Sequence, residues 1–396
     1  MPMLRHGRDA MPSHGRVLVI EIVVYPGQPL GHPPPMSALE RRVTCGGKER
    51  TAPECATLLH STGLRLAQGT PIHGSCCSRV EATPACRPPG KRHPGLIRRR
   101  RIRMPESRVS VGNVEIVGLT DIEVEFPVPL TQLFPHVPLA AWEPHRQRYP
   151  EVFPRPDTWR PHFGGFVLRS QGRTILVDTG MGSTVTNPGA VAMFTGGADG
   201  HLLEELQAVG MRPDDIDTVF LTHLHPDHVG WNLRPGGGPA QATFPRARYL
   251  THRADWEAFK SPEVQGHFLF SYWQETLGPL ESLGVLELLT GEQALTGEIT
   301  AIPTPGHTPG SMGLAIVSGG QRALLIGDVT VHPAQVTEPD WVFAFDMDPV
   351  QAVQTRKQML ERAEAEEALV IACHFPHPGH GRLVRLEGRR YWQGGL

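Results

Sequence analysis

The sequence has no uninterrupted apolar run of the roughly 20 residues that a membrane-spanning helix needs. The strongest apolar stretch near its start is VLVIEIVVY, from Val17 to Tyr25, and Glu21 interrupts it. A signal peptide is the weaker interpretation of this stretch, because PGQPLGHPPP follows in place of a small-residue cleavage site. We therefore expect a cytoplasmic protein without a membrane partner.

Cysteine is scarce and unevenly distributed. Only Cys373 lies in the last three quarters of the chain, and the other five cysteines are Cys45, Cys55, Cys76, Cys77 and Cys86. Their spacing matches no paired CxxC pattern of a structural zinc site. Disulfides or a metal site in this segment stay open as alternatives, and we favour idle thiols.

A strong net charge is also absent, since the formal charge is −2. The segment up to Arg103 has 17 Lys and Arg against 6 Asp and Glu, a net +11, and the remainder carries −13. The acidic remainder lacks the basic face with which a nuclease holds phosphates, so we expect no nucleic-acid partner. The run RRRRIR could contact nucleic acid or anionic lipid, but a solvated charge run is the simpler interpretation.

The basic segment has little periodic pattern and is rich in proline. Such a segment buries too little apolar surface to offset its ordering entropy. We predict that residues 1–103 form a low-order basic Pro-rich extension. Whether this segment belongs to the natural protein or results from an upstream extension of the reading frame stays open, with both alternatives weighted equally. The folded domain is predicted to span residues 104–396, because alternation of apolar and polar residues begins after Met104.

Strand-like runs alternate with helical stretches in this second part. Runs such as GRTILVDTG, DTVFLT, ALLIGD and ALVIACHF are bounded by Gly, Pro or Asp, as strands are. The stretches GHLLEELQAVG and DMDPVQAVQTRKQMLERAEAEE have the helical period, and the second begins with Asp348 as an N-cap. This order favours an α/β fold with two packed sheets and helices outside.

The stretch HLHPDH, residues 223–228, concentrates potential metal ligands directly after a predicted strand. His223 and His225 are two residues apart, so both side chains point to one side of the strand. Pro226 then bends the chain and directs Asp227 and His228 toward a neighbouring position. No packing or capping requirement calls for this pattern, and four residues cannot complete two metal sites. Further ligands are therefore expected from elsewhere.

Three further candidates end strands or follow them closely: His307 in PTPGHTPGS, Asp328 in ALLIGD and His374 in ALVIACHF. Ligands at the ends of several strands can converge on one edge of a sheet. The remaining nearby histidines are interpreted as supporting or surface groups; they are His162, His332, His377 and His380. Cys373 precedes His374 on a strand and should face the core.

These motifs, with ILVDTG upstream, resemble the metallo-β-lactamase fold superfamily of binuclear metallohydrolases. The resemblance implies an αββα four-layer sandwich. It assigns His223, His225 and His307 to a first metal and Asp227, His228 and His374 to a second. It further implies that Asp328 bridges the metals and that Asp178 supports the site without binding metal.

A finer resemblance comes from FAFDMDPVQAVQTRKQML followed by ACHFPHPG, which is similar to methyl parathion hydrolase and its lactonase-like relatives. The acyl-homoserine lactonases place a tyrosine near their substrate. No tyrosine lies between His307 and Tyr391 here, which weakens the case for a signalling lactone. We expect two divalent ions, with zinc first and manganese, iron or cobalt as alternatives.

The ligand set predicts hydrolysis. Two divalent ions, two carboxylates and a bridging hydroxide leave a net +1, which suits an anionic transition state. We predict a binuclear metal-dependent hydrolase of lactone or carboxylic ester bonds that acts through a metal-bridging hydroxide, with Asp227 as proton acceptor or donor. The alternatives are a phosphotriester hydrolase and, less favoured, a thioesterase or a mononuclear-iron persulfide dioxygenase.

A small molecule is the expected substrate, and a homodimer is left open. The segment between the motifs is rich in aromatic residues, of which Trp256, Phe270 and Tyr272 are predicted to bind an apolar substrate. Ordinary core packing is an equal explanation for such a cluster.

Overall fold

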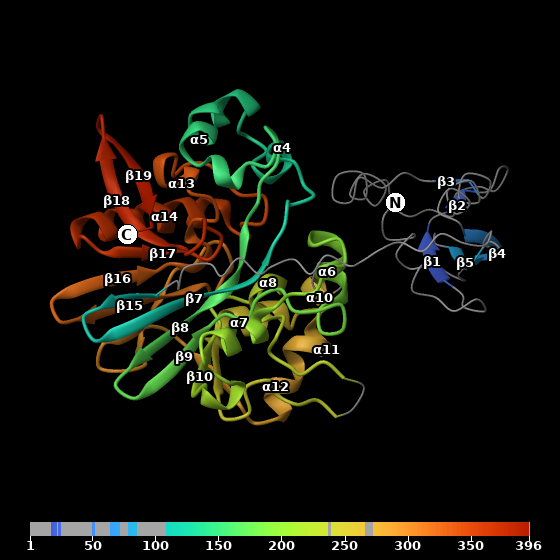
Figure 1. Ribbon diagram of the computed structural model, residues 1–396, viewed down its shortest axis with the longest axis horizontal. Coiled ribbons are helices and arrows are strands. Elements are labelled where there is room, and N and C mark those ends of the chain that lie inside the picture. Colours follow the sequence, from blue (N-terminus) through green and yellow to red (C-terminus); the bar gives the residue numbers. More distant parts are fainter. Residues whose placement is uncertain are drawn as a thin grey trace, which may run out of the picture. The chain divides into compact units, whose positions relative to one another are not determined.

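The protein is described here from a computed structural model, which divides the chain into two units, Met1–Ile102 and Arg103–Leu396 (Figure 1). In the second unit the structure describes residues 108–236, 239–265 and 272–395. In the first unit it describes the backbone of five short strands. Among the described residues no helix combines the length and apolar character needed to cross a membrane.

The strands of the first unit form two small sheets. An antiparallel sheet has the order β1-β5-β4, with β1 at Val17–Glu21, β4 at Leu64–Pro71 and β5 at Ser78–Pro84. A parallel pair joins β2 (Val23–Val24) and β3 (Arg50–Thr51). Strands β1 and β2 lie in the apolar stretch VLVIEIVVY, whereas β3 to β5 lie where no element was predicted. The expected low order of the rest of this segment, its cysteines and the run RRRRIR lie outside the described residues.

Two seven-stranded sheets form the second unit. The first has the order β12-β11-β10-β9-β8-β7-β6. Its strands are β6 (Arg108–Val111), β7 (Val114–Glu123), β8 (His162–Ser170), β9 (Arg173–Val177), β10 (Thr218–Phe220), β11 (Arg248–His252) and β12 (Leu286–Leu289). The second runs β13-β14-β15-β16-β17-β18-β19. Its strands are β13 (Gln293–Ala294), β14 (Ile299–Pro303), β15 (Met312–Ser318), β16 (Gln321–Leu325), β17 (Leu369–Ile371), β18 (His380–Leu386) and β19 (Arg389–Gly394).

Helices cover the outer faces of both sheets (Figure 1). The α-helices are α4 (Leu130–Leu133), α5 (Glu143–Arg148), α6 (Pro188–Phe194), α7 (Leu202–Ala208), α8 (Pro226–Val229), α9 (Arg253–Phe259), α10 (Pro262–Gln265), α11 (Trp273–Thr276), α12 (Gly278–Ser282), α13 (Ala334–Thr337) and α14 (Pro349–Ala365). Short 3-10 turns are η1 (Leu139–Trp142), η2 (Pro150–Val152), η3 (Pro213–Asp215) and η5 (Gly327–Val329). Asp348 caps α14 by accepting a hydrogen bond from the Gln351 N–H, as the sequence predicts.

Three apolar cores separate the four layers. One lies between the sheets and joins residues such as Phe166 and Val177 to Leu314 and Leu325. A second packs α7, α9, α11 and α12 on the first sheet, and a third packs α14 and the α4–α5 region on the second. Burial on both faces explains why the central strands read as continuous apolar runs. The predicted αββα sandwich is confirmed.

Strand direction sets the position of the site. In the first sheet β10 runs parallel to β9 and β11, and its end leads directly into HLHPDH. In the second sheet β16 runs parallel to β17, so the residues that follow the two strands leave at the same edge. Asp328 follows β16 and His374 follows β17. Pro226 opens the one-turn helix α8, which carries Asp227 and His228.

Candidate metal centre

Three histidines form a compact group, with His223 and His225 after β10 and His307 in the loop after β14. His223 Nε2 lies 3.1 Å from His225 Nδ1, which lies 2.9 Å from His307 Nε2. Burial, together with the neighbouring His307, lowers the pKa of His225 to about 3, and burial lowers the pKa of His223 well below its usual range. His223 and His225 therefore present neutral imidazole nitrogens, the form that binds metal.

A second group consists of Asp227, His228 and His374, whose ligand atoms lie within 4.8 Å of one another. Asp227 Oδ2 is 3.4 Å from His228 Nε2 and 3.3 Å from His374 Nε2. Burial alone would raise the pKa of Asp227, but the neighbouring His228 and His374 outweigh it and lower the pKa to about 2. Asp227 is therefore ionised at neutral pH.

Asp328 lies between the two groups. Its Oδ2 atom is 3.0 Å from His374 Nε2 and 3.4 Å from His307 Nε2, and its Oδ1 atom is 3.6 Å from His228 Nε2. Although burial alone would raise the pKa of this carboxyl, His374 and His228 lower it well below its usual range. Its Oδ2 atom also lies 3.9 Å from His223 Nε2, so Asp328 faces two members of the first group and two of the second as an anion.

Orphaned atoms show that this arrangement fits cations. His228 Nε2 and Asp328 Oδ1 are buried and have no hydrogen-bond partner, although such atoms are normally satisfied. The facing imidazole nitrogens of the first group cannot all donate to one another when neutral. Seven nitrogen and oxygen donors arranged in this way match the preference of zinc and related divalent ions.

Asp178 supports the site from behind through three hydrogen bonds. Its carboxylate accepts from the Thr222 N–H at 2.7 Å, from the Thr222 hydroxyl at 2.8 Å and from His228 Nδ1 at 2.9 Å. A carboxylate on the far nitrogen of a histidine fixes the ring and its tautomer. Cys373 is buried between the sheets, where its thiol contacts Asp178 at 3.5 Å.

The other four histidines take different positions. His162 packs against the site, because its backbone carbonyl accepts a hydrogen bond from His374 Nδ1 at 3.0 Å. His332 is fully buried among aromatic rings, with Trp142 at 5.1 Å and Phe153 at 5.2 Å between centroids. The remaining two, His377 and His380, belong to none of the candidate ligand groups of the described residues.

Two buried carboxylates near the site were missed by sequence reasoning. Asp346 accepts from His307 Nδ1 at 2.9 Å. Asp255 accepts from the Thr308 hydroxyl at 2.8 Å and from the Gly310 N–H at 2.5 Å, and so holds the loop that carries His307. Asp255 lies within a helix and Asp346 within a loop, and neither position carries a pattern that points to a partner about 40 or more residues away.

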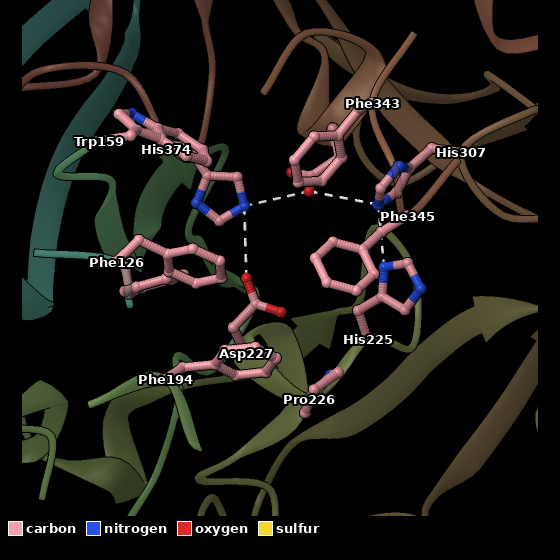
Figure 2. Close-up of a pocket in the computed structure, with 12 residues that line it drawn as sticks. Phe126, Trp159, Phe194, His225, Pro226, Asp227, His307, Phe343, Phe345 and His374 are labelled. Carbon is pink, nitrogen blue, oxygen red and sulfur yellow. Dashed lines mark hydrogen bonds and ion pairs between the residues drawn. The ribbon is translucent and has the colours of Figure 1, made fainter. Parts of the chain in front are cut away.

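An aromatic pocket opens over the proposed ligands (Figure 2). Its floor contains His225, Asp227, His307, Asp328 and His374. Figure 2 shows His374 and Asp227 facing His225 and His307 across the cavity. The rest of its lining is Phe126, Trp159, Phe163, Phe194, Pro226, Phe343 and Phe345. Apart from the floor residues, the lining within the described part of the chain includes no charged side chain.

Two of the three aromatic residues predicted to bind substrate lie away from this pocket. Trp256 is buried in the core and packs on Trp273 with ring centroids 4.7 Å apart, so core packing explains it. Tyr272 is also buried and donates its hydroxyl to the Leu224 carbonyl. Neither is among the residues that line the pocket, and Phe270 lies outside the described residues. Trp256 and Tyr272 thus lie in the core and not along this pocket, and core and pocket aromatics look alike in sequence.

Comparison with known proteins identifies the family. The profile of the metallo-beta-lactamase superfamily matches residues 165–374, more than half of the chain. The chain belongs to the metallo-beta-lactamase superfamily. The predicted resemblance and the prediction of a hydrolase are therefore confirmed.

Relatives within this superfamily include lactonases. The N-acyl homoserine lactonase AiiA of Bacillus thuringiensis subsp. kurstaki is 26% identical over 221 residues, which cover 53% of this chain and 79% of AiiA. The uncharacterized protein YobT of Bacillus subtilis (strain 168) is 28% identical over 199 residues, 48% of this chain and 77% of YobT.

Solved structures share the fold. AidC, a dizinc quorum-quenching lactonase, has a TM-score of 0.62 and 22% identity, covering 74% of this chain and 97% of AidC. The hydrolase AbOPH has a TM-score of 0.62 and 23% identity, covering 72% of this chain and 96% of its own.

Proposed function

We propose that the protein is a binuclear metal-dependent hydrolase that opens lactone or carboxylic ester bonds through a hydroxide bridging two divalent ions. The position of Asp328 carries this proposal, because one buried carboxylate faces ligand atoms of both groups. The first ion would be held by His223, His225 and His307, and the second by Asp227, His228 and His374. Zinc fits this donor set, and the dizinc description of AidC supports it.

Bound divalent ions supply a water nucleophile of lowered pKa and a Lewis acid for the oxygen under attack. The protein's own groups do the remaining work. Asp227 is ionised and lies at the floor of the pocket, so it can accept a proton from the nucleophile and pass it to the leaving alkoxide. The chain therefore needs no side-chain nucleophile.

The pocket favours an uncharged, partly apolar substrate. Phe126, Phe194, Phe343 and Phe345 surround the floor and offer no partner for a charged group. A charged substituent in this wall would lose its hydration without gaining a partner. N-acyl homoserine lactones act as substrates of relatives such as AiiA, and a lactone with an apolar substituent is the class that we propose here.

Competition between matched substrates tests the proposal. An aryl-substituted lactone, an aryl carboxylic ester and an aryl phosphotriester are compared by kcat/KM on zinc- and manganese-loaded protein. We expect the lactone or ester to exceed the phosphotriester at least tenfold, which corresponds to about 1.4 kcal/mol of transition-state stabilisation. A tenfold preference for the phosphotriester would refute the carbonyl assignment. A β-lactam is assayed alongside, and a protein that hydrolyses the β-lactam but none of the other three substrates would refute both the lactone or ester assignment and the phosphotriester alternative.

A further inference from the structure

Asp346 is a buried carboxylate, and donor groups lie against both of its oxygens. Oδ1 lies 2.9 Å from His307 Nδ1. Oδ2 accepts from the Arg356 guanidinium at 3.3 Å and from the Phe343 N–H at 3.1 Å. The side chains of Asp346 and Arg356 are 0% and 1% exposed, so this pair is fully removed from water. A carboxylate in such a setting is stabilised only by these donors.

Arg356 fixes the far side of this carboxylate from helix α14. Its Nε donates to the Val329 carbonyl at 2.7 Å, one residue after Asp328. Its Nη1 donates to two carbonyls of the loop before Asp346, those of Pro339 at 3.0 Å and Trp341 at 2.9 Å. A guanidinium can serve these directions at once because its five N–H groups form a rigid planar fork.

The same segment forms the pocket wall against His307. The Phe343 ring stacks on the His307 ring, with centroids 6.2 Å apart and planes inclined by 22°. The Met347 N–H donates to the His307 carbonyl and the Asp348 N–H to the Gly306 carbonyl, both at 2.9 Å. Residues 343–348 therefore wrap the histidine, and Phe343 also lines the substrate pocket (Figure 2).

We propose that Asp346 is a positioning residue that couples the aromatic pocket wall to the proposed metal ligand His307. By accepting from Nδ1 it holds the tautomer whose Nε2 lone pair faces the site, and by accepting from the Phe343 N–H it holds the wall. Arg356 keeps the carboxylate in place for both tasks. This inference rests on the proposed function, since it assigns His307 to a metal.

Asp346→Asn is the informative change. An amide has one acceptor oxygen, whereas the two sides of Asp346 both face donors. If the oxygen turns to Arg356 and Phe343, the amide N–H₂ faces His307 Nδ1 and favours the tautomer with a protonated Nε2, which cannot bind metal. If it turns to His307, the Phe343 turn and Arg356 lose their acceptor.

The experiment measures metal and substrate affinity together. Apo-protein is titrated with cobalt and zinc against a competing chelator, the absorption spectrum of the cobalt-loaded protein is recorded, and KM is measured for an aryl-substituted lactone. For Asp346→Asn we expect metal affinity to fall 10- to 100-fold at one of two sites, with a changed cobalt spectrum and a raised KM. A merely structural carboxylate would not alter the cobalt spectrum.

Two variants complete the design. Asp121→Asn removes another buried carboxylate, which accepts from the Met181, Gly182 and Trp231 N–H groups but contacts none of the proposed ligands, so its cobalt spectrum should match that of the parent protein. Arg356→Lys keeps the charge but loses the fork and should weaken metal binding in the same direction as Asp346→Asn. If Asp346→Asn does not fold, the metal affinity and cobalt spectrum of Arg356→Lys test the coupling role.

Each outcome has a distinct meaning. A parent protein that binds no metal refutes the proposed function and the inference that depends on it. A parent protein with two ions, combined with a folded Asp346→Asn or Arg356→Lys variant whose affinities, spectrum and KM stay within twofold, refutes the coupling role alone.

Discussion

His374 is the proposed ligand most distant in sequence from HLHPDH, so replacing it tests whether strand β17 completes the metal centre. Its Nε2 atom lies 3.3 Å from Asp227 and 3.0 Å from Asp328, and its Nδ1 atom donates to the His162 carbonyl. His374→Ala removes a nitrogen ligand from the second group. Asp227, His228 and the shared carboxylate of Asp328 then remain as ligands of that site.

The size of the effect follows from these contacts. The buried Asp328 and the half-buried Asp227 each lose a partner, and the buried His162 carbonyl loses its donor. Each buried group left unsatisfied costs on the order of 1–3 kcal/mol of folding stability. We expect the bound metal to fall from about two ions toward one, and turnover to fall at least ~10-fold, the lower end for a disturbed metal environment.

Elemental analysis after dialysis gives the metal content, lactone hydrolysis gives the turnover, and thermal unfolding shows whether the variant is folded. His377→Ala is the matched control, because His377 lies three residues on and contacts Thr120 at 3.4 Å but belongs to no candidate ligand group. It should change metal content and turnover far less. A folded His374→Ala variant with two ions and normal kcat/KM would show that His374 is only a strand-end residue.

Three further predictions concern the extension, the metal and pH. Because residues 1–103 lack the pattern of an apolar core, their deletion should leave the melting temperature and turnover of residues 104–396 nearly unchanged; an inactive truncated protein that keeps its metal would contradict this. Chelation should abolish turnover and lower the melting temperature, since an ion that binds only the folded chain stabilises it by mass action, and an unchanged melting curve would count against a filled site. Burial, helped by Arg389, lowers the pKa of His145 from 6.5 to about 4, so its neutral form stabilises the fold above pH 6.5 and that contribution is lost as pH falls toward 4. His145→Gln should therefore reduce the loss of unfolding free energy between pH 7 and pH 4 by up to about 3 kcal/mol, as measured by urea titration at both pH values, and equal losses in both proteins would refute the assignment.

Local periodicity was enough to predict the strands that bring the candidate ligands together. The run DTVFLT forms β10 and delivers His223, and ALVIACHF forms β17 and delivers His374. Asp328 could be included because it directly follows an apolar strand, and parallel strands release their ends at one edge. The layers follow from the same signal, since strands buried on both faces need a cover on each side.

Contacts between distant segments were beyond the reach of sequence reasoning. Asp346 meets His307 across 39 positions, and nothing in FDMD distinguishes this aspartate from Asp348, which caps a helix. The pocket wall combines Phe126 with Phe343, which are joined only by the folded layers. Trp256 was assigned to the pocket, yet the helix α9 that carries it turns this side chain into the core.

The central claim is that two metal ions lie on either side of Asp328. Anomalous diffraction from a crystal of the zinc-loaded protein, collected at the zinc absorption edge, measures this directly. The proposal predicts two peaks, one among His223, His225 and His307 and the other among Asp227, His228 and His374, with Asp328 in contact with both. A single peak, or peaks away from Asp328, would contradict it.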